Sequence, residues 1–187
     1  MRVIAGQYRS RRLKGPGRMR LRPTSDRLRE TLFNVLGPTI KDSFFVDLFA
    51  GTGAIGIEAI SRGARETIFV ESNAKAARLI RENLNTLEIR TGAELMEAPA
   101  LRGLERMAAR HLLADFIFLD PPYEKTGDYI EVLEFLDASH LIAPRGIVIA
   151  EHCWKTELPE FLTRLECNRQ LEQGDAILSF YTLAAAA

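Results

Sequence analysis

A glycine-rich turn, Gly51-Thr-Gly-Ala-Ile-Gly56, is the segment that most narrows the folds open to this chain. It follows a nearly continuous apolar run at 44–49 and precedes a stretch with the apolar spacing of a helix. Such a run is typical of a strand buried on both faces of a parallel sheet. A G-x-G-x-x-G turn between strand and helix is typical of an open α/β sheet whose ligand approaches the backbone closely. An α/β fold is therefore the first expectation.

The rest of the chain is predicted to alternate between helices and strands. Thr24 or Ser25 supplies the cap oxygen of a first helix, which Gly37-Pro38 ends. Helices are expected at 54–62, 73–84, 101–108 and 128–136, and strands at 67–71, 93–97, 115–120, 147–150, 162–171 and 176–183. The segment 144–146 reads as a break before its strand. The pattern predicts a doubly wound, Rossmann-like, mostly parallel sheet with a terminal hairpin that makes one edge antiparallel.

The 187 residues suffice for one sizeable domain. We expect a basic extension at 1–41 (a small hairpin plus a helix), a ligand-binding domain at 42–183 and a short tail at 184–187. No window approaches 18 uncharged apolar residues, so no membrane span is expected. Cys153 and Cys167 fit neither a disulfide framework nor a metal spacing. Together with the absence of a signal-peptide pattern after Met1, this favours a cytoplasmic protein, with a monomer as the default.

The charges are strongly segregated along a chain whose formal net charge is zero. Residues 1–41 hold 11 basic and 2 acidic side chains, a net charge of +9, so residues 42–187 carry −9. Such asymmetry suggests a nucleic-acid-facing arm on an acidic body. The side chains expected to contact RNA phosphates are Arg9, Arg11, Arg12, Lys14, Arg18, Arg20 and Arg22.

An acid at the end of the second core strand indicates what the glycine turn binds. Glu71 lies 18 residues past Gly53, where a carboxylate reaches ribose hydroxyls, so an adenosine-type ligand is predicted. NAD is the first alternative. The basic arm has no role in a dehydrogenase, and Asp47 is unhelpful to a pyrophosphate. Asp47 suits the ammonium and sulfonium of S-adenosylmethionine (SAM) instead.

A second motif, Asp120-Pro-Pro-Tyr123, follows the strand at 115–120 and therefore lies over the same crevice. The prolines fix the backbone, so the Asp120 carboxylate and the Pro121 carbonyl keep constant directions. Two fixed acceptors suit the two donors of an exocyclic amine. Tyr123 offers a flat face on which a base stacks once it leaves its helix or lies in an unpaired loop.

Three stretches, Arg22-Pro-Thr-Ser-Asp-Arg-Leu-Arg-Glu-Thr-Leu-Phe-Asn34, Asp47–Ala59 and Asp120–Tyr123, closely resemble the RsmD family of bacterial 16S rRNA guanine-N2 methyltransferases. The resemblance implies a class I SAM-dependent methyltransferase domain of seven strands, preceded by an extension that helps to bind RNA. It places the catalytic base pocket on Asp120, Pro121 and Tyr123. The residues implied to hold SAM are Asp47, Phe49, Ala50, Gly51, Thr52, Gly53, Glu71, Ser72 and Ala100. No metal is implied.

The stretch Met96-Glu-Ala-Pro-Ala100 departs from the family pattern, which ends this strand in an Asp or Asn that holds the adenine amino group. Either Glu97 takes that role or the backbone alone makes the contact. The expected partner is 16S rRNA within a small-subunit particle. Two other functions stay open: a DNA amino-methyltransferase acting on adenine N6, for which the chain has no room for a target-recognition domain, and a non-catalytic RNA-binding module.

Overall fold

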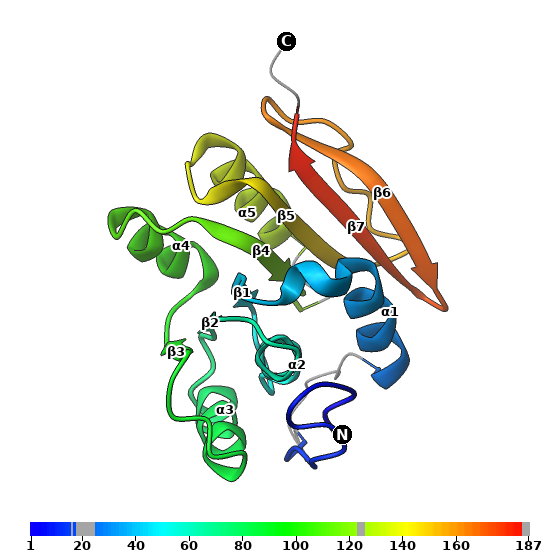
Figure 1. The fold of residues 1–187 in the computed structure, drawn as a ribbon. Helices are drawn as coiled ribbons and strands as arrows, with labels where there is room; N and C mark the ends of the chain where they lie inside the picture. Colours follow the sequence, from blue (N-terminus) through cyan, green and yellow to red (C-terminus); the bar gives the residue numbers. More distant parts are fainter. Residues whose placement is uncertain (16, 18–24, 123–125, 185–187) are drawn as a thin grey trace.

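A computed structural model of the chain describes residues 1–15, 17, 25–122 and 126–184 (Figure 1). Its centre is a seven-stranded sheet with the order β3-β2-β1-β4-β5-β7-β6. The five strands from β3 to β5 are parallel to one another, and β7 runs antiparallel to both of its neighbours. The strands are Phe44–Leu48 (β1), Glu66–Val70 (β2), Ala93–Met96 (β3), Ala114–Leu119 (β4), Ile142–Cys153 (β5), Leu165–Gln173 (β6) and Ala176–Leu183 (β7). The expected mostly parallel sheet with a terminal antiparallel hairpin is confirmed.

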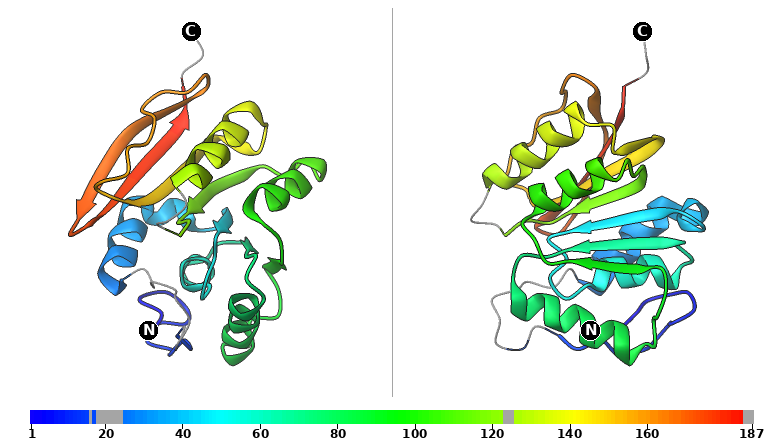
Figure 2. Two further views of the ribbon diagram at one scale, coloured as in Figure 1. Left: turned by 180° about the vertical axis from the view of Figure 1, so that it is seen from behind. Right: turned by 90° about the vertical axis from the view of Figure 1, so that its left-hand side faces the viewer.

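Helices cover both faces of the sheet (Figure 2). They are Asp26–Leu36 (α1), Ala54–Ser61 (α2), Ala74–Thr86 (α3), Ala100–Ala109 (α4) and Thr126–Ala138 (α5), and a 3-10 turn, η1, follows α1 at Gly37–Ile40. The helices α4 and α5 share one apolar cluster with the sheet. The helices α1, α2 and α3 contribute to two clusters on the opposite face. The strands β1 and β4 are buried along their length, which explains their continuous apolar sequences.

The residues expected to cap two helices do so in the structure. The Ser25 hydroxyl accepts a hydrogen bond from the Leu28 amide at 3.1 Å, and α1 ends at Leu36 just before Gly37. The Asn73 side chain accepts from the first amides of α3. Both caps satisfy amides that a helix cannot bond internally, so these positions were readable from residue type alone.

The strand β5 corrects the sequence interpretation of residues 144–146. These residues were expected to break the chain before a strand at 147–150, but β5 runs through them from Ile142. The register with β4 shifts between Ala114 and Phe116, and such an irregularity accommodates a proline. Gly146 lies against this irregularity, where an added Cβ would come within 2.8 Å of the Ala114 carbonyl oxygen.

The first fourteen residues form an irregular hairpin rather than two strands. A single bridge pairs Arg2 with Arg12, flanked by hydrogen bonds from the Val3 amide to the Arg11 carbonyl and from Leu13 to Met1. Val3 and Leu13 are buried in the same cluster as residues of α2 and α3. This hairpin is therefore packed onto the body of the protein. Within the described residues no helix is long and apolar enough to cross a membrane.

Candidate active site

The strand order changes direction between β1 and β4, and this is where an open α/β sheet forms its ligand crevice. Leu48 and Leu119 are register partners at the carboxyl ends of these adjacent strands. Phe49, which opens the glycine turn, and Asp120, which opens the Asp-Pro-Pro segment, are the next residues along each strand. The structure thus brings the two sequence motifs together at one edge of the sheet.

The glycine turn is compact and internally bonded. Gly51 and Gly53 have φ values of 54° and 75°, in the left-handed region that glycine adopts without strain. The Gly53 amide donates to the Ala50 carbonyl at 2.7 Å. A Cβ at Gly56 would approach the Phe69 ring of β2 to 2.3 Å, so this third glycine permits close packing of helix on strand. A Cβ at Gly51 would meet only the Phe49 carbonyl oxygen, at 3.8 Å, so the turn is open on that side.

Glu71 joins the end of β2 to the glycine turn. Its side chain is 7% exposed, and one carboxylate oxygen accepts from the Gly51 amide at 2.8 Å. The other oxygen accepts from the Asn73 amide at 2.7 Å. A carboxylate has about four acceptor positions, so these two bonds leave capacity for further donors such as ribose hydroxyls.

Asp47 lies beneath the turn rather than at its surface. Its carboxylate accepts from the Gly56 amide at 2.8 Å and so caps the first turn of α2 from the adjoining strand. Burial raises the pKa of Asp47 well above its ordinary value; the Gly56 hydrogen bond opposes the rise and the nearby Glu71 charge adds to it. Asp47 was expected from sequence to suit the ammonium and sulfonium of SAM, whereas its hydrogen bond to the Gly56 amide carries no sequence signal.

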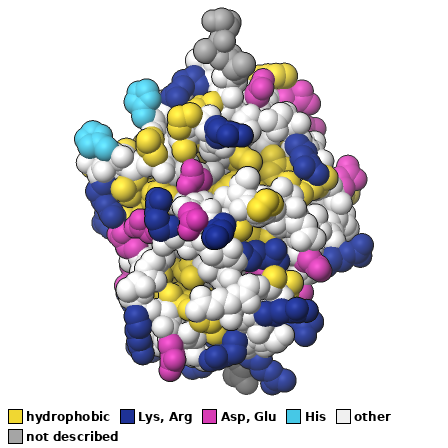
Figure 3. All heavy atoms as spheres, viewed as in Figure 1, with side chains coloured by type: hydrophobic (Ala, Val, Ile, Leu, Met, Phe, Trp, Pro, Cys, Tyr) yellow, Lys and Arg dark blue, Asp and Glu magenta, His cyan; other side chains and the backbone are white. Residues whose placement is uncertain are grey.

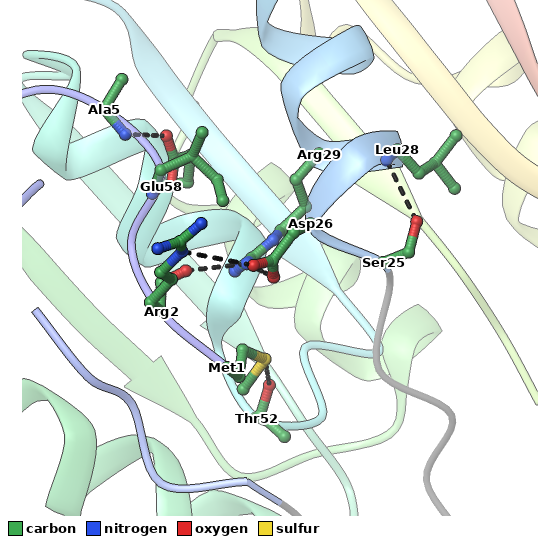
Figure 4. Close-up of polar contacts among 10 residues, drawn as sticks. Met1, Arg2, Ala5, Ser25, Asp26, Leu28, Arg29, Thr52 and Glu58 are labelled. Atoms are coloured by element: carbon green, nitrogen blue, oxygen red, sulfur yellow. Dashed lines mark hydrogen bonds and ion pairs between the residues drawn. The ribbon is translucent and has the colours of Figure 1, made fainter. Parts of the chain in front are cut away.

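The remaining positions expected to hold SAM surround the same turn. Ala50 and Thr52 are buried, whereas Ser72 is exposed. The Thr52 hydroxyl contacts the Met1 sulfur at 3.8 Å (Figure 4). The Thr52 carbonyl accepts a hydrogen bond from the Asn83 side chain of α3. The amino-terminal residue therefore lies against the glycine turn.

The stretch between β3 and α4 indicates whether the Glu97 side chain or the backbone would contact the adenine of SAM. Glu97 is exposed and forms an ion pair with Arg81 of α3. Ala98 is buried, and Ala100, also buried, is the first residue of α4. A Glu97 carboxylate bound to Arg81 favours the backbone option.

The Asp-Pro-Pro segment leaves the sheet directly after β4. Asp120 is partly buried, Pro121 is buried and Pro122 is exposed; Tyr123 lies outside the described residues. The structure adds a carboxylate that sequence reasoning missed. Glu151 of β5 is 5% exposed and follows Ala150, the register partner of Leu119. An acid within a long strand carries no local signal, and only the register between β4 and β5 reveals its position.

The basic hairpin is held on α2 through its backbone. Glu58 is fully buried, and its two carboxylate oxygens accept from the amides of Ile4 and Ala5 at 2.8 and 3.0 Å (Figure 4). The Ser61 carbonyl and hydroxyl accept from the amides of Gln7 and Tyr8. These bonds fix the hairpin while leaving its basic side chains outside.

The basic side chains differ in how they are engaged. Arg9, Arg11, Arg12 and Lys14 are all exposed. Lys14 forms an ion pair with Glu82 at 3.0 Å, and Arg11 donates to the Thr86 carbonyl at 3.1 Å. Figure 3 shows Lys and Arg side chains over the lower part of the face in view, where Figure 1, seen from the same side, draws the hairpin and α3. Arg18, Arg20 and Arg22 lie outside the described residues.

Arg29 is a basic residue of the amino-terminal segment that does not face solvent. It is fully buried and donates to the Arg2 carbonyl at 2.8 Å and to Asp26 at 2.7 Å (Figure 4). Within the part of the chain that the structure describes, its Nε and Nη1 atoms have no hydrogen-bond partner. Arg29 therefore joins α1 to the hairpin, and its charge is not part of the exposed basic surface.

The acceptor groups at this edge fit SAM chemically. The buried Glu71 carboxylate keeps acceptor capacity for hydroxyl groups of a ligand, and the turn is open at Gly51. Among the described residues no group of three His, Cys, Asp or Glu side chains could hold a metal ion.

Comparison with known proteins supports this assignment. The model of the family described as "Conserved hypothetical protein 95" matches residues 1–182. "Putative rRNA methyltransferase YlbH" of Bacillus subtilis is 38% identical over 97% of this chain and 98% of its own length. "Ribosomal RNA small subunit methyltransferase D" of Escherichia coli is 33% identical, over 97% of this chain and 89% of its own length.

Solved structures agree with these relatives. The structure of yhhF from Escherichia coli superposes with a TM-score of 0.84 at 30% identity, covering 100% of this chain and 99% of that one. An RNA methyltransferase from Salinibacter ruber, solved with S-adenosyl-L-homocysteine, shares the fold with a TM-score of 0.65 at 12% identity, over 89% of this chain and 96% of its own. The fold is that of class I SAM-dependent methyltransferases, which confirms the expected fold and cofactor class. The chain belongs to the RsmD/YlbH family, the family of the matching model.

Proposed function

We propose that this protein transfers a methyl group from SAM to the exocyclic N2 amine of a guanine in 16S rRNA of the small ribosomal subunit. One observation carries the proposal: Asp120-Pro121-Pro122 leaves β4 beside the glycine turn that leaves β1. A group that binds an amine and a turn that binds SAM are thus neighbours. The name of the Escherichia coli relative, 33% identical over nearly the whole chain, supports the small subunit as the source of the substrate.

In this proposal the chain's own residues hold and orient the reactants. The turn from Phe49 to Gly53 and the Glu71 carboxylate bind SAM, which supplies an electrophilic methyl group when bound. The Asp120 carboxylate and the Pro121 carbonyl accept the two hydrogens of the guanine amine, which directs the nitrogen lone pair and stabilises the positive charge that develops on nitrogen. Fixed acceptors also reduce the entropy cost of alignment.

A basic surface near this edge would hold the RNA. The exposed side chains of Arg9 and Arg12 make no ion pair with a described residue, so they are available to phosphates. Phosphate contacts of this kind position RNA without reading its sequence. We further propose that the protein acts as a cytoplasmic monomer on an assembling particle, whose own proteins help to present the base.

The test is transfer of labelled methyl groups to undermethylated small ribosomal subunits and, in a parallel reaction, to DNA, each followed by nucleoside analysis. We expect label in N2-methylguanosine. Label in another nucleoside would overturn the choice of guanine N2, and label in N6-methyladenine of DNA would favour the alternative amino-methyltransferase. A protein that binds SAM but labels neither would contradict the enzymatic proposal.

A further inference from the structure

A buried carboxylate at the end of β5 takes no part in the reaction as proposed above. Glu151 is 5% exposed, and acidic side chains are almost never fully buried unless they are paired. Glu151 is not without a partner, and the acceptor positions of a carboxylate, about four in number, leave capacity for a further donor. The strands β4 and β5 are parallel, with Leu119 and Ala150 as register partners. Asp120 is the first residue after β4 and Glu151 is the next residue on β5, and neighbouring strands lie about 4.8 Å apart.

The alternation of side chains along paired strands predicts that the two carboxylates fall on the same face of the sheet. Phe118 and Ile149 belong to the apolar cluster that α1 covers, whereas Leu119 and Ala150 belong to the cluster on the α5 side. Side chains alternate between faces along a strand, so the following residues, Asp120 and Glu151, return to the face of Phe118 and Ile149.

The backbone of Glu151 is held firmly. The Tyr129 hydroxyl of α5 donates to the Glu151 carbonyl at 2.6 Å, and Glu151 pairs with Leu178 of β7. The next residue, His152, is fixed by a hydrogen bond between its Nε2 atom and the Ser179 hydroxyl at 2.8 Å. A side chain on so constrained a segment reaches a reproducible position, as recognition of a base edge requires.

Guanine offers a third donor beside its amine. Its N1–H adjoins the N2 amine, whereas the adenine ring nitrogen next to the N6 amine is an acceptor. If Asp120 and Pro121 take the amine hydrogens, a second carboxylate on the same face is suited to N1–H. We propose that Glu151 accepts the hydrogen bond from N1–H of the target guanine and so determines the choice of base. This inference rests on the proposed function and names the residue that gives it specificity.

The proposal predicts a specific response to one altered base. 2,6-Diaminopurine keeps the N2 amine but has an unprotonated N1, which a carboxylate repels. Sites built to hydrogen-bond a substrate group discriminate strongly against analogues that lack it. We therefore expect wild-type protein to favour guanine over 2,6-diaminopurine by at least about 5-fold in kcat/KM, the lower end of the discrimination that a good base contact provides.

The decisive variant is Glu151→Gln, because an amide both accepts from N1–H and donates to an unprotonated N1. Small-subunit particles are reconstituted with guanine or 2,6-diaminopurine at the position that wild-type protein methylates. The guanine preference is expected to fall at least about 5-fold in Glu151→Gln. The control Glu134→Gln changes an exposed carboxylate on α5 and should keep the preference. SAM affinity, measured by calorimetry, should stay near the wild-type value in both variants.

The outcomes separate this inference from the proposed function. A Glu151→Gln variant that loses activity equally on both bases, or keeps the wild-type preference, overturns the role of Glu151. If the variant does not fold, wild-type protein alone decides: equal kcat/KM on the two bases overturns the inference, and a preference for guanine supports it. If wild-type protein methylates neither particle, the proposed function itself fails.

Discussion

The Glu71 carboxylate accepts a hydrogen bond from the Gly51 amide at 2.8 Å, joining the end of β2 to the glycine turn that follows β1. The same side chain also accepts from the Asn73 amide at the start of α3. A residue expected to bind ribose therefore already organises the turn. Because Glu71 holds the glycine turn and is also expected to bind ribose, a change at this residue should affect both the turn and the proposed ribose contact.

Replacing Glu71 should affect stability and SAM binding together. Glu71→Ala leaves two amides without their acceptor, at a cost of about 1–3 kcal/mol in the free energy of unfolding, and removes the proposed ribose contact. Glu71→Gln keeps one acceptor oxygen and should lie between alanine and wild type on both scales. Thermal unfolding and calorimetric titration with SAM measure the two effects. Unchanged SAM affinity in Glu71→Ala would remove this residue from the cofactor site.

Asp47 should make the protein less stable as the pH rises. Its folded pKa is raised, chiefly by burial, so above the ordinary value of about 4 the unfolded chain loses a proton that the folded protein keeps. The cost to stability grows with pH through this window and is complete above the folded pKa. Asp47→Asn removes the charge and keeps an acceptor for the Gly56 amide.

We therefore expect Asp47→Asn to be more stable than wild type at neutral pH, with a smaller gain near pH 4. Unfolding curves from pH 4 to 8 measure this gain and its dependence on pH. If Asp47→Asn were less stable than wild type throughout this range, the buried Asp47 carboxylate would not lower the stability of the protein.

Glu58 should control whether the basic hairpin stays docked. Glu58→Ala deprives the Ile4 and Ala5 amides of their acceptor and should release the hairpin, at a cost of about 1–3 kcal/mol. Trypsin would then cleave after Arg9, Arg11 and Arg12 several-fold faster. The matched control Glu131→Ala removes an exposed carboxylate on α5 and should digest like wild type. Equal digestion of Glu58→Ala and wild type would argue against this anchor.

The basic hairpin should make RNA binding depend on salt. Log affinity is expected to fall linearly with log salt concentration, and each lost phosphate contact should reduce the slope by about 0.7–0.9. Arg9→Ala and Arg12→Ala should each show this reduction. Lys14→Ala should show less, because Glu82 already engages its ammonium group. Filter binding between about 50 and 200 mM salt measures the slopes, because nucleic-acid affinity changes strongly over this range.

A basic residue near the amino ends of the parallel strands provides the control for these arginine and lysine variants. Arg145 is exposed near the amino end of β5, away from the proposed site. Arg145→Ala should leave the slope unchanged. An equal reduction for Arg145→Ala and Arg12→Ala would indicate that RNA binds without preference for the hairpin.

The features that were predictable from sequence are those set by neighbouring residues. The apolar run of β1, the left-handed glycines after it and the caps at Ser25 and Asn73 each follow from local chemistry. Features set by distant partners were not predictable. The start of β5 depends on its irregular register with β4.

Hydrogen bonds at the site also depend on distant partners and were not predictable from sequence. That Asp47 binds an amide of α2, and that Arg29 is buried against Arg2, depends on how separate elements pack. That Glu151 follows the register partner of Leu119 depends on one strand pairing. Sequence motifs identified which residues gather at the site, and packing decided which of their atoms are already engaged.

The most direct test of the account is the N2-methylguanosine content of 16S rRNA from cells that lack this protein, with plasmids that restore the wild-type chain or Asp120→Ala. The account predicts that N2-methylguanosine falls in the deletion strain, returns with the wild-type chain and does not return with Asp120→Ala, although that variant binds SAM as tightly as wild type. An N2-methylguanosine content that is unchanged by the deletion, or fully restored by Asp120→Ala, would contradict it.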